Sequence, residues 1–244
     1  MNNLIYQYYL PYKKNETKPK WVDIGIQSAK DYANTIGVEY MFHDKPWMNS
    51  SINVFESLRL IFDESFDEYD NILLLDVDMI VNTTENIFDI PVADVGMVHE
   101  HGVSNRTPVP GAAFDYTFWN NYFHHPFRGI VSYAQRHLSP SFVWKKHTKD
   151  PFVLYNGGLQ LWSRDGRIKA RNLFPRKLHD SFRMETNKGE TPYLNMMFIH
   201  HQFDVTELNN DWNRLNFQWE KDGRLGKITH FNDISKDKMY THGK

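Results

Sequence analysis

Residues 69–81 read Tyr-Asp-Asn-Ile-Leu-Leu-Leu-Asp-Val-Asp-Met-Ile-Val, an apolar run that passes straight into two aspartates. The four aliphatic residues at 72–75 are typical of a strand that is covered on both faces of a sheet, because neither face then needs a polar side chain. Asp76 and Asp78 end the run. We therefore expect a buried β-strand that carries two carboxylates at its carboxyl end.

The spacing of the two aspartates favours a metal site. An extended chain repeats every two residues, so both carboxylates lie on one side of it and repel each other unless a cation lies between them. Carboxylate oxygens suit the hard ions Mg²⁺ and Mn²⁺, which often leave coordination positions for substrate phosphates. The pattern predicts a divalent ion held against a phosphorylated ligand. Paired acids after a strand are also common as turn formers or helix caps, and this alternative stays open.

Composition limits the class of protein. The chain has 244 residues, of which 41% are hydrophobic, and no Pro-, Gly- or Ser-rich linker divides it, so we expect one domain over residues 1–244. The net charge of -2 gives no indication of a nucleic-acid partner or of a membrane-binding surface. The absence of cysteine excludes disulfides and thiolate zinc sites.

Targeting segments are not recognisable in the sequence. The first residues lack the basic region and apolar core of a signal peptide, and no apolar run approaches the ~20 residues of a membrane span. We therefore expect no integral membrane segment and a cytoplasmic location, which is the host-cell cytoplasm if the chain is viral.

Strands and helices alternate at the start of the chain. Apolar runs predict strands at 4–10, 38–42 and 72–75, with helical spacing of apolar residues before Gly37 and again at 55–62. This order predicts parallel strands joined by right-handed crossovers, as in the first half of a Rossmann-like sheet. Ligands bind at the carboxyl ends of such strands, where Asp76 and Asp78 lie.

The segment 102–149 is less regular. It is rich in proline, aromatic residues and histidine, and it predicts an elaborated loop region with one helix near 130–137. A further strand is expected at 152–162, where Asn156-Gly157-Gly158 interrupts the hydrophobic pattern. Glycine inside a strand marks a bulge or a close approach to the backbone, and here we favour the close approach of a ligand.

Several motifs follow one another within residues 50–236. They are Tyr69-Asp70-x4-Leu75-Asp76-Val77-Asp78, Tyr155-Asn156-Gly157-Gly158-Leu159-Gln160-Leu161, Glu190-Thr191-Pro192-Tyr193-Leu194-Asn195, Asp211-Trp212-Asn213 and Ile228-Thr229-His230-Phe231-x4-Lys236. Together they resemble GT-A nucleotide-sugar glycosyltransferases, especially the family-eight type that includes glycogenin and the bacterial lipooligosaccharide galactosyltransferases. A weaker likeness connects the chain with short virus-encoded GT-A enzymes that glycosylate capsid proteins.

This resemblance implies a fold. An α/β, single-domain GT-A structure is expected, with a Rossmann-like, mostly parallel mixed central sheet flanked by helices. The nucleotide-binding half would occupy residues 1–100, and the half for the acceptor and the donor sugar residues 101–244. The chain departs from the family at Asp233, at Asp237-Lys238 and at Glu190-Thr191, where the family usually has Gly, Pro-Trp and Asp-Gln.

The resemblance also implies roles for single residues. Asp76, Asp78 and His230 would hold the metal, which is Mn²⁺ or Mg²⁺. Lys236 and Glu190 are the expected catalytic residues, Lys236 as a positive charge on the diphosphate and Glu190 as a hydrogen-bond partner of the sugar. Contacts with the substrate are expected from Arg59, Asp76, Asn156, Gly157, Gly158 and Lys236.

The implied function is metal-dependent transfer of a hexose-type sugar from a nucleoside diphosphate sugar, a UDP-sugar in particular, to a glycan or glycoprotein acceptor. The family-eight likeness implies retention of the anomeric configuration. An inverting enzyme would need a carboxylate base, for which Glu100, Asp115 and Asp211 are unranked candidates. A nucleotide-sugar hydrolase and a non-catalytic carbohydrate-binding protein are the alternatives, and measuring transfer to sugar acceptors against release of free sugar separates them.

Overall fold

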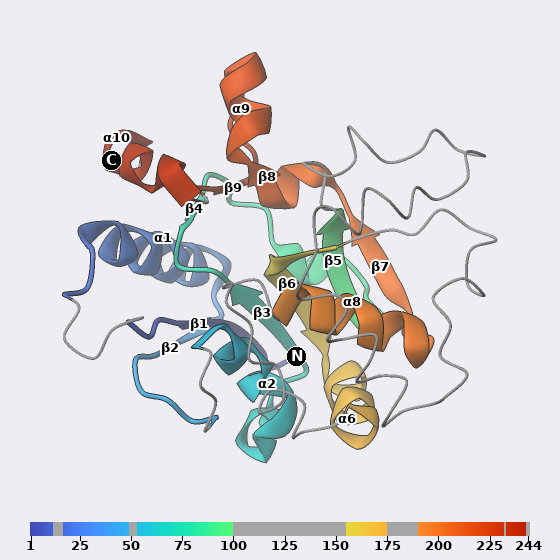
Figure 1. The fold of residues 1–244 in the computed structure, drawn as a ribbon. Helices are drawn as coiled ribbons and strands as arrows, with labels where there is room; N and C mark the ends of the chain where they lie inside the picture. Colours follow the sequence, from blue (N-terminus) through green and yellow to red (C-terminus); the bar gives the residue numbers. More distant parts are fainter. Residues whose placement is uncertain (12–16, 49–52, 100–154, 175–189, 232, 243–244) are drawn as a thin grey trace, which may run out of the picture.

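A six-stranded mixed sheet forms the centre of the molecule (Figure 1). The structure is a computed structural model that describes residues 1–11, 17–48, 53–99, 155–174, 190–231 and 233–242. In spatial order the strands are β2 (Glu39–His43), β1 (Asn3–Tyr8), β3 (Asn71–Leu75), β6 (Tyr155–Ser163), β5 (Val95–His99) and β7 (Val205–Leu208). Only β6 runs antiparallel to its neighbours, so the expected mostly parallel mixed sheet is confirmed.

A second, three-stranded sheet lies beside the first and has the order β4 (Met79–Val81), β9 (Ile228–His230) and β8 (Arg214–Leu215). In it β9 pairs antiparallel with β4 and parallel with β8. Because β4 begins directly after the two aspartates, this small sheet connects the C-terminal part of the chain to the carboxyl end of β3.

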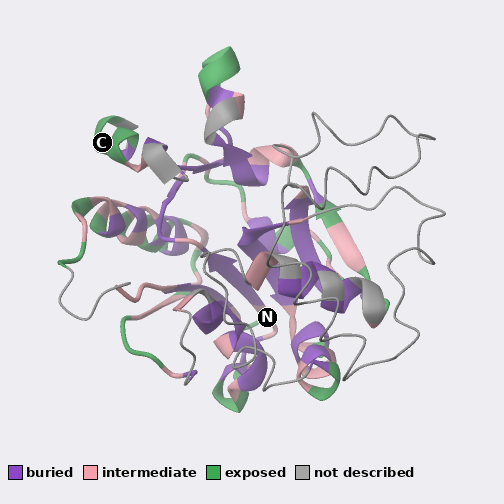
Figure 2. Ribbon diagram, in the orientation of Figure 1, coloured by how far each residue is buried: buried purple, intermediate pink, exposed green. Residues whose placement is uncertain are grey.

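Helices cover both faces of the large sheet, and the side chains of β3 alternate between two apolar clusters. Ile72 and Leu74 belong to one cluster, while Leu73 and Leu75 belong to the other. Helix α1 (Lys20–Ile36) contributes Ala29 and Ala33 to the second cluster. The expected fully covered central strand is thus confirmed, and Figure 2 shows β3 as buried.

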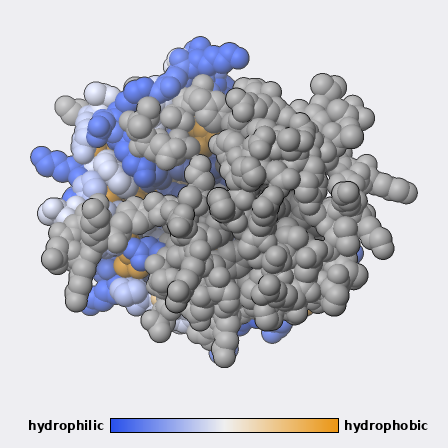
Figure 3. Space-filling view, viewed as in Figure 1, coloured by the Kyte–Doolittle hydropathy of each residue, from blue (hydrophilic) through white to orange (hydrophobic). Residues whose placement is uncertain are grey.

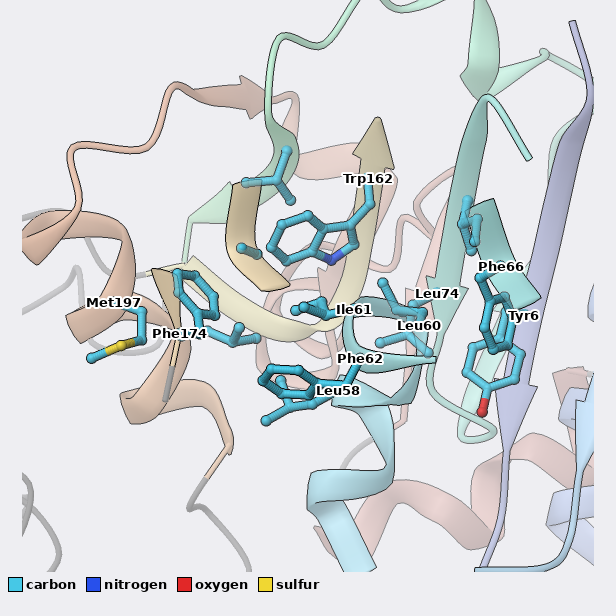
Figure 4. Packing of buried hydrophobic residues seen from close by; sticks show 14 of the residues in the cluster. Tyr6, Leu58, Leu60, Ile61, Phe62, Phe66, Leu74, Trp162, Phe174 and Met197 are labelled. Carbon is cyan, nitrogen blue, oxygen red and sulfur yellow. The ribbon is translucent and has the colours of Figure 1, made fainter. Parts of the chain in front are cut away.

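The first cluster lies between the large sheet and the helices that cover the face opposite to α1 (Figure 4). These are α2 (Arg59–Phe62), α6 (Arg164–Leu173) and α8 (Glu190–His200), together with the 3-10 segments η1 (Asn53–Leu58) and η2 (Glu64–Glu68). The helix expected at 55–62 is thus a 3-10 segment followed by one short α-helix. Helix α1 ends where the sequence predicted, at Gly37, whose φ of 70° lies in the left-handed region that glycine adopts readily.

Short elements complete the described structure: η3 (Ile87–Asp89), η5 (Asn210–Asn213), α9 (Asn216–Asp222), η6 (Asp233–Lys238) and α10 (Met239–His242). The expected loop region at 102–149, its helix near 130–137, the start of the strand expected at 152–162, and the candidate bases Glu100 and Asp115 all lie outside the described residues.

Among the described helices, none combines the length and the apolar character needed to cross a membrane. On the face drawn in Figure 3, the described residues that are visible are mostly hydrophilic, with small hydrophobic areas between them.

Candidate metal and donor-sugar site

The segment from Asp76 to Asp78 is held by contacts from three elements. The backbone N–H of Asp76 donates to the carbonyl of Gly158 in β6 (2.8 Å). The carbonyl of Asp76 accepts from the buried side chain of Gln7 in β1 (3.2 Å). Behind the segment, a Cβ atom on Gly25 of α1 would overlap the carbonyl oxygen of Val77. Only a residue without a side chain allows α1 to pack this closely against the two aspartates.

His230 reaches the aspartates through the small sheet. It follows Asp78 by 152 residues (230 minus 78), and β9 places it opposite Met79 of β4. The N–H of Phe231 also donates to the carbonyl of Asp78 (2.8 Å). His230 Nε2 consequently lies 3.2 Å from Asp78 Oδ1 and 3.9 Å from Asp76 Oδ2.

These three residues form a group that fits a divalent metal ion. Each offers one ligand atom, and the three atoms lie within 4.8 Å of one another. Two carboxylate oxygens and one imidazole nitrogen are donors that suit Mn²⁺ as well as Mg²⁺. The structure therefore brings together the three residues that the resemblance assigned to the metal.

The pKa values of the two carboxyl groups of this site are shifted in opposite directions. Burial, together with the charge of Asp78, raises the pKa of Asp76 to about 6. Burial by itself would raise the pKa of Asp78 too, but His230 and Lys236 outweigh it and lower that pKa to about 2. Two acids this close together are unfavourable without a cation, which agrees with the repulsion inferred from their spacing.

Lys236 lies against the same group. It is part of η6, and its ammonium is 3.0 Å from Asp78 Oδ2 and 4.6 Å from the centre of the Trp21 ring. The sequence predicted this lysine at the diphosphate of the donor. In the structure its positive charge is paired with Asp78, so the lysine and the metal group share one carboxylate.

Glu190 begins α8 and faces the glycines of β6. A Cβ atom on Gly157 would overlap Glu190 Oε1 and the hydroxyl of Thr191. Gln160, which is fully buried, donates to Glu190 Oε1 (2.9 Å). Burial and the nearby charge of Asp76 raise the pKa of Glu190 to about 8. The surroundings of Glu190 thus favour its protonated carboxyl group over the ionised one.

Gly158 faces the metal group itself. A Cβ atom there would lie 2.6 Å from His230 Cε1 and 2.9 Å from Asp76 Oδ2. Opposite these glycines the register of β5 and β6 shifts between Met97 and His99, so a bulge is present as well. The close approach to the glycine backbone is made by side chains of the site, and the approach of a ligand remains a prediction.

Arg59 has other partners than those expected. Its Nε donates to Asp63 Oδ2 (3.0 Å) and its Nη1 to His43 Nδ1 (2.8 Å), and its guanidinium lies 5.5 Å from the centre of the Trp47 ring. Among the described residues these contacts orient Arg59 toward the end of β2. The expected contact with a substrate is left as a prediction.

Sequence reasoning overlooked the polar side chains that support the site. Gln7 and Gln160 are both fully buried within strands, and Asn213 at the end of η5 is 2% exposed. A glutamine within an otherwise apolar strand was the signal that could have found the first two, because a buried amide needs hydrogen-bond partners. Gly25 gave no such signal, since glycine in a helix does not indicate which element approaches it.

The comparisons with known proteins agree with this architecture. No family model matches the chain, and no curated protein matches it either. Among solved structures, a glycosyltransferase involved in glycosylation of the major capsid of PBCV-1 is similar over 100% of this chain and 98% of its own, with a TM-score of 0.56 and 13% identity. The galactosyltransferase LgtC, solved with donor and acceptor sugar analogs, is similar over 98% and 95%, with a TM-score of 0.51 and 10% identity.

The bifunctional glycosyltransferase WbbM is similar over 95% of this chain and 46% of its own, with a TM-score of 0.55 and 11% identity. At such identities the likeness shows the fold. The chain has the GT-A fold of these glycosyltransferases, as the sequence predicted, and the narrower likeness to family eight stays a prediction.

Proposed function

We propose that this protein is a metal-dependent glycosyltransferase that moves a hexose-type sugar from a nucleoside diphosphate sugar, in particular a UDP-sugar, to a glycan or glycoprotein acceptor. The observation that carries the proposal is the meeting of Asp76, Asp78, His230 and Lys236 at the carboxyl end of β3. A site for a metal and a diphosphate accounts for both His230 and Lys236.

The chemistry of sugar transfer explains why these residue types are needed. As the bond from the anomeric carbon to the donor breaks, negative charge develops on the leaving diphosphate and must be stabilised. Mn²⁺ or Mg²⁺ held by Asp76, Asp78 and His230 supplies Lewis-acid stabilisation of the phosphates when bound. Lys236 adds a positive charge beside them. This charge lies next to Asp78 and therefore beside the proposed position of the ion.

The other residues of the site bind the donor in this proposal. Glu190 is held by Gln160 and presents its carboxyl group to sugar hydroxyls. Gly157 and Gly158 leave room for Glu190 and the metal group against the β6 backbone and are proposed as contacts of the donor, as is Asn156 beside them on the same strand. Arg59 lies with Trp47 near the end of β2, and it is proposed as a contact of the nucleotide.

The first experiment measures thermal stability with UDP and Mn²⁺, separately and together. A ligand at about 100 times its dissociation constant stabilises the folded state by about 2.7 kcal/mol. For a domain of this size we therefore expect Tm to rise by about 5 to 10 °C with both ligands and very little with UDP in excess chelator. Equal stabilisation by UDP in chelator would contradict the proposed site.

The control variants separate the metal group from the rest of the protein. Asp78→Asn should abolish the joint effect of Mn²⁺ and UDP, because it removes a ligand and leaves the side-chain volume nearly unchanged. Asp165→Asn, on the exposed start of α6, should leave the effect intact. A panel of UDP-sugars is then assayed with and without sugar acceptors. A product that depends on the acceptor indicates a transferase, and release of free sugar alone indicates a hydrolase. Binding without turnover indicates a carbohydrate-binding protein.

A further inference from the structure

A chain of hydrogen bonds leads from the backbone of β6 to the ring of His230. The N–H of Gly158 donates to Asn156 Oδ1 (2.9 Å), and Asn213 Nδ2 donates to the same oxygen (2.9 Å). Asn213 Oδ1 in turn lies 3.1 Å from His230 Nδ1. The three side chains are 9%, 2% and 5% exposed, so the chain lies in the interior beside the metal group.

The direction of every bond in this chain follows from its first member. A backbone N–H can only donate, so the atom of Asn156 next to Gly158 must be the amide oxygen. A second neighbour of that oxygen must also donate, which places the NH₂ group of Asn213 toward Asn156. The oxygen of Asn213 then faces His230, and the ring nitrogen Nδ1 must carry a hydrogen.

This direction decides which nitrogen of His230 faces the metal group as a ligand. In a neutral imidazole with hydrogen on Nδ1, the lone pair is on Nε2. Nε2 is the atom that lies 3.2 Å from Asp78 Oδ1 and 3.9 Å from Asp76 Oδ2. The opposite tautomer would direct an N–H at the position of the ion.

We propose that Asn156 and Asn213 are positioning residues that hold His230 in the tautomer required for metal binding. The proposal deepens the proposed function, because it rests on the same metal group. It gives Asn156 a role beyond the sugar contact expected from the sequence. It also gives Asn213 a role through its amide, which must donate on one side and accept on the other.

The direct test observes the tautomer in the metal-free protein. We would record ¹⁵N shifts of the histidine rings while raising the pH until the signals of His230 are those of a neutral ring, and assign His230 with a His230→Gln variant. The wild-type ring should show hydrogen on Nδ1. Asn213→Leu removes the acceptor and should release this preference, whereas Asn213→Asp keeps an acceptor oxygen and should preserve it. A wild-type ring with hydrogen on Nε2, or an unchanged tautomer in folded Asn213→Leu, would overturn the proposal.

Metal affinity provides the second measurement, by calorimetry with Mn²⁺ alone. Loss of an outer hydrogen-bond partner typically weakens metal binding about 10- to 100-fold, and we expect this for Asn213→Leu and for Asn156→Leu. The matched control is Asn195→Leu, which removes an equally buried asparagine whose hydrogen bonds go to Tyr155 and Thr191 and not to the metal group.

Equal losses of affinity in Asn195→Leu and Asn213→Leu would mean that any buried amide matters equally, and the positioning role would be refuted. A wild-type protein that binds neither Mn²⁺ nor Mg²⁺ would refute the metal site and with it the proposed function. The tautomer measurement needs no metal, so it still decides whether the asparagine pair controls the ring of His230.

Discussion

Replacing Glu190 by glutamine should make the stability of the protein less dependent on pH. Burial and the charge of Asp76 raise the pKa of the Glu190 carboxyl from its ordinary value of 4.5 to about 8 in the folded chain. Glutamine has nearly the same shape, keeps a carbonyl oxygen for the hydrogen bond from Gln160, and does not ionise. The variant therefore removes the titration and leaves the packing in place.

The magnitude follows from the two pKa values. A carboxyl group whose pKa is higher in the folded chain favours folding fully below pH 4.5, and this contribution is lost as the pH rises through about 8. The gap corresponds to about 5 kcal/mol at ~1.4 kcal/mol per pH unit. Glu190 is only partly buried, so water reduces the effect, and we expect the wild type to lose about 2 kcal/mol relative to Glu190→Gln between pH 5 and pH 8.

Urea unfolding at several pH values, in chelator, measures this difference. Asp76 titrates in both proteins, so the difference between the two curves reports Glu190 together with its coupling to Asp76. The control is Glu68→Gln, whose side chain is exposed and whose curve should run parallel to that of the wild type. Parallel curves for wild type and Glu190→Gln would show that Glu190 is not held protonated by its surroundings, and the assigned burial would be wrong.

Two further substitutions address the surroundings of the aspartates. Lys236→Met removes the positive charge 3.0 Å from Asp78. Such an ion pair is worth about 1.4 kcal/mol even in water, so Mn²⁺ without nucleotide should bind about tenfold more tightly to the variant. UDP in the presence of Mn²⁺ should bind more weakly. Calorimetry checks this against Lys227→Met, which pairs with the exposed Glu85, and unchanged Mn²⁺ affinity in Lys236→Met would contradict it. Gly25→Ala should lower the free energy of unfolding by about 1 to 3 kcal/mol and weaken Mn²⁺ binding, because the added methyl group meets the carbonyl of Val77. The control Lys30→Ala, on the exposed side of α1, should change neither quantity.

The large sheet could be predicted because its signals are local. The apolar run at 72–75 predicts a strand that is covered on both faces, and Gly37 marks a helix end through its backbone freedom. Both features depend on residues within a few positions. The helix expected at 55–62 was the weaker interpretation, because apolar spacing alone does not separate an α-helix from a 3-10 segment.

The spacing of Asp76 and Asp78 indicates a metal site by itself, but His230 and Lys236 could be assigned to it only through the resemblance. No local pattern connects His230 with Asp78, since the pairing of β4 with β9 is decided by the tertiary structure. The supporting amides show the same limit. Gln160 bonds Trp162 and Glu190 at once, and such a role depends on which groups surround it after folding.

The charges of the site suggest why its residues need one another. When ionised, Asp76, Asp78 and Glu190 carry three negative charges, and Lys236 contributes one positive charge, which leaves an excess of two (3 minus 1) with His230 neutral. This excess of negative charge agrees with the raised pKa values of Asp76 and Glu190, because a proton bound to either carboxylate reduces the negative charge. One divalent ion carries the opposite charge of two. A bound metal would therefore lower the pKa of both carboxyl groups, and it would release Lys236 from Asp78 toward the phosphates of a donor.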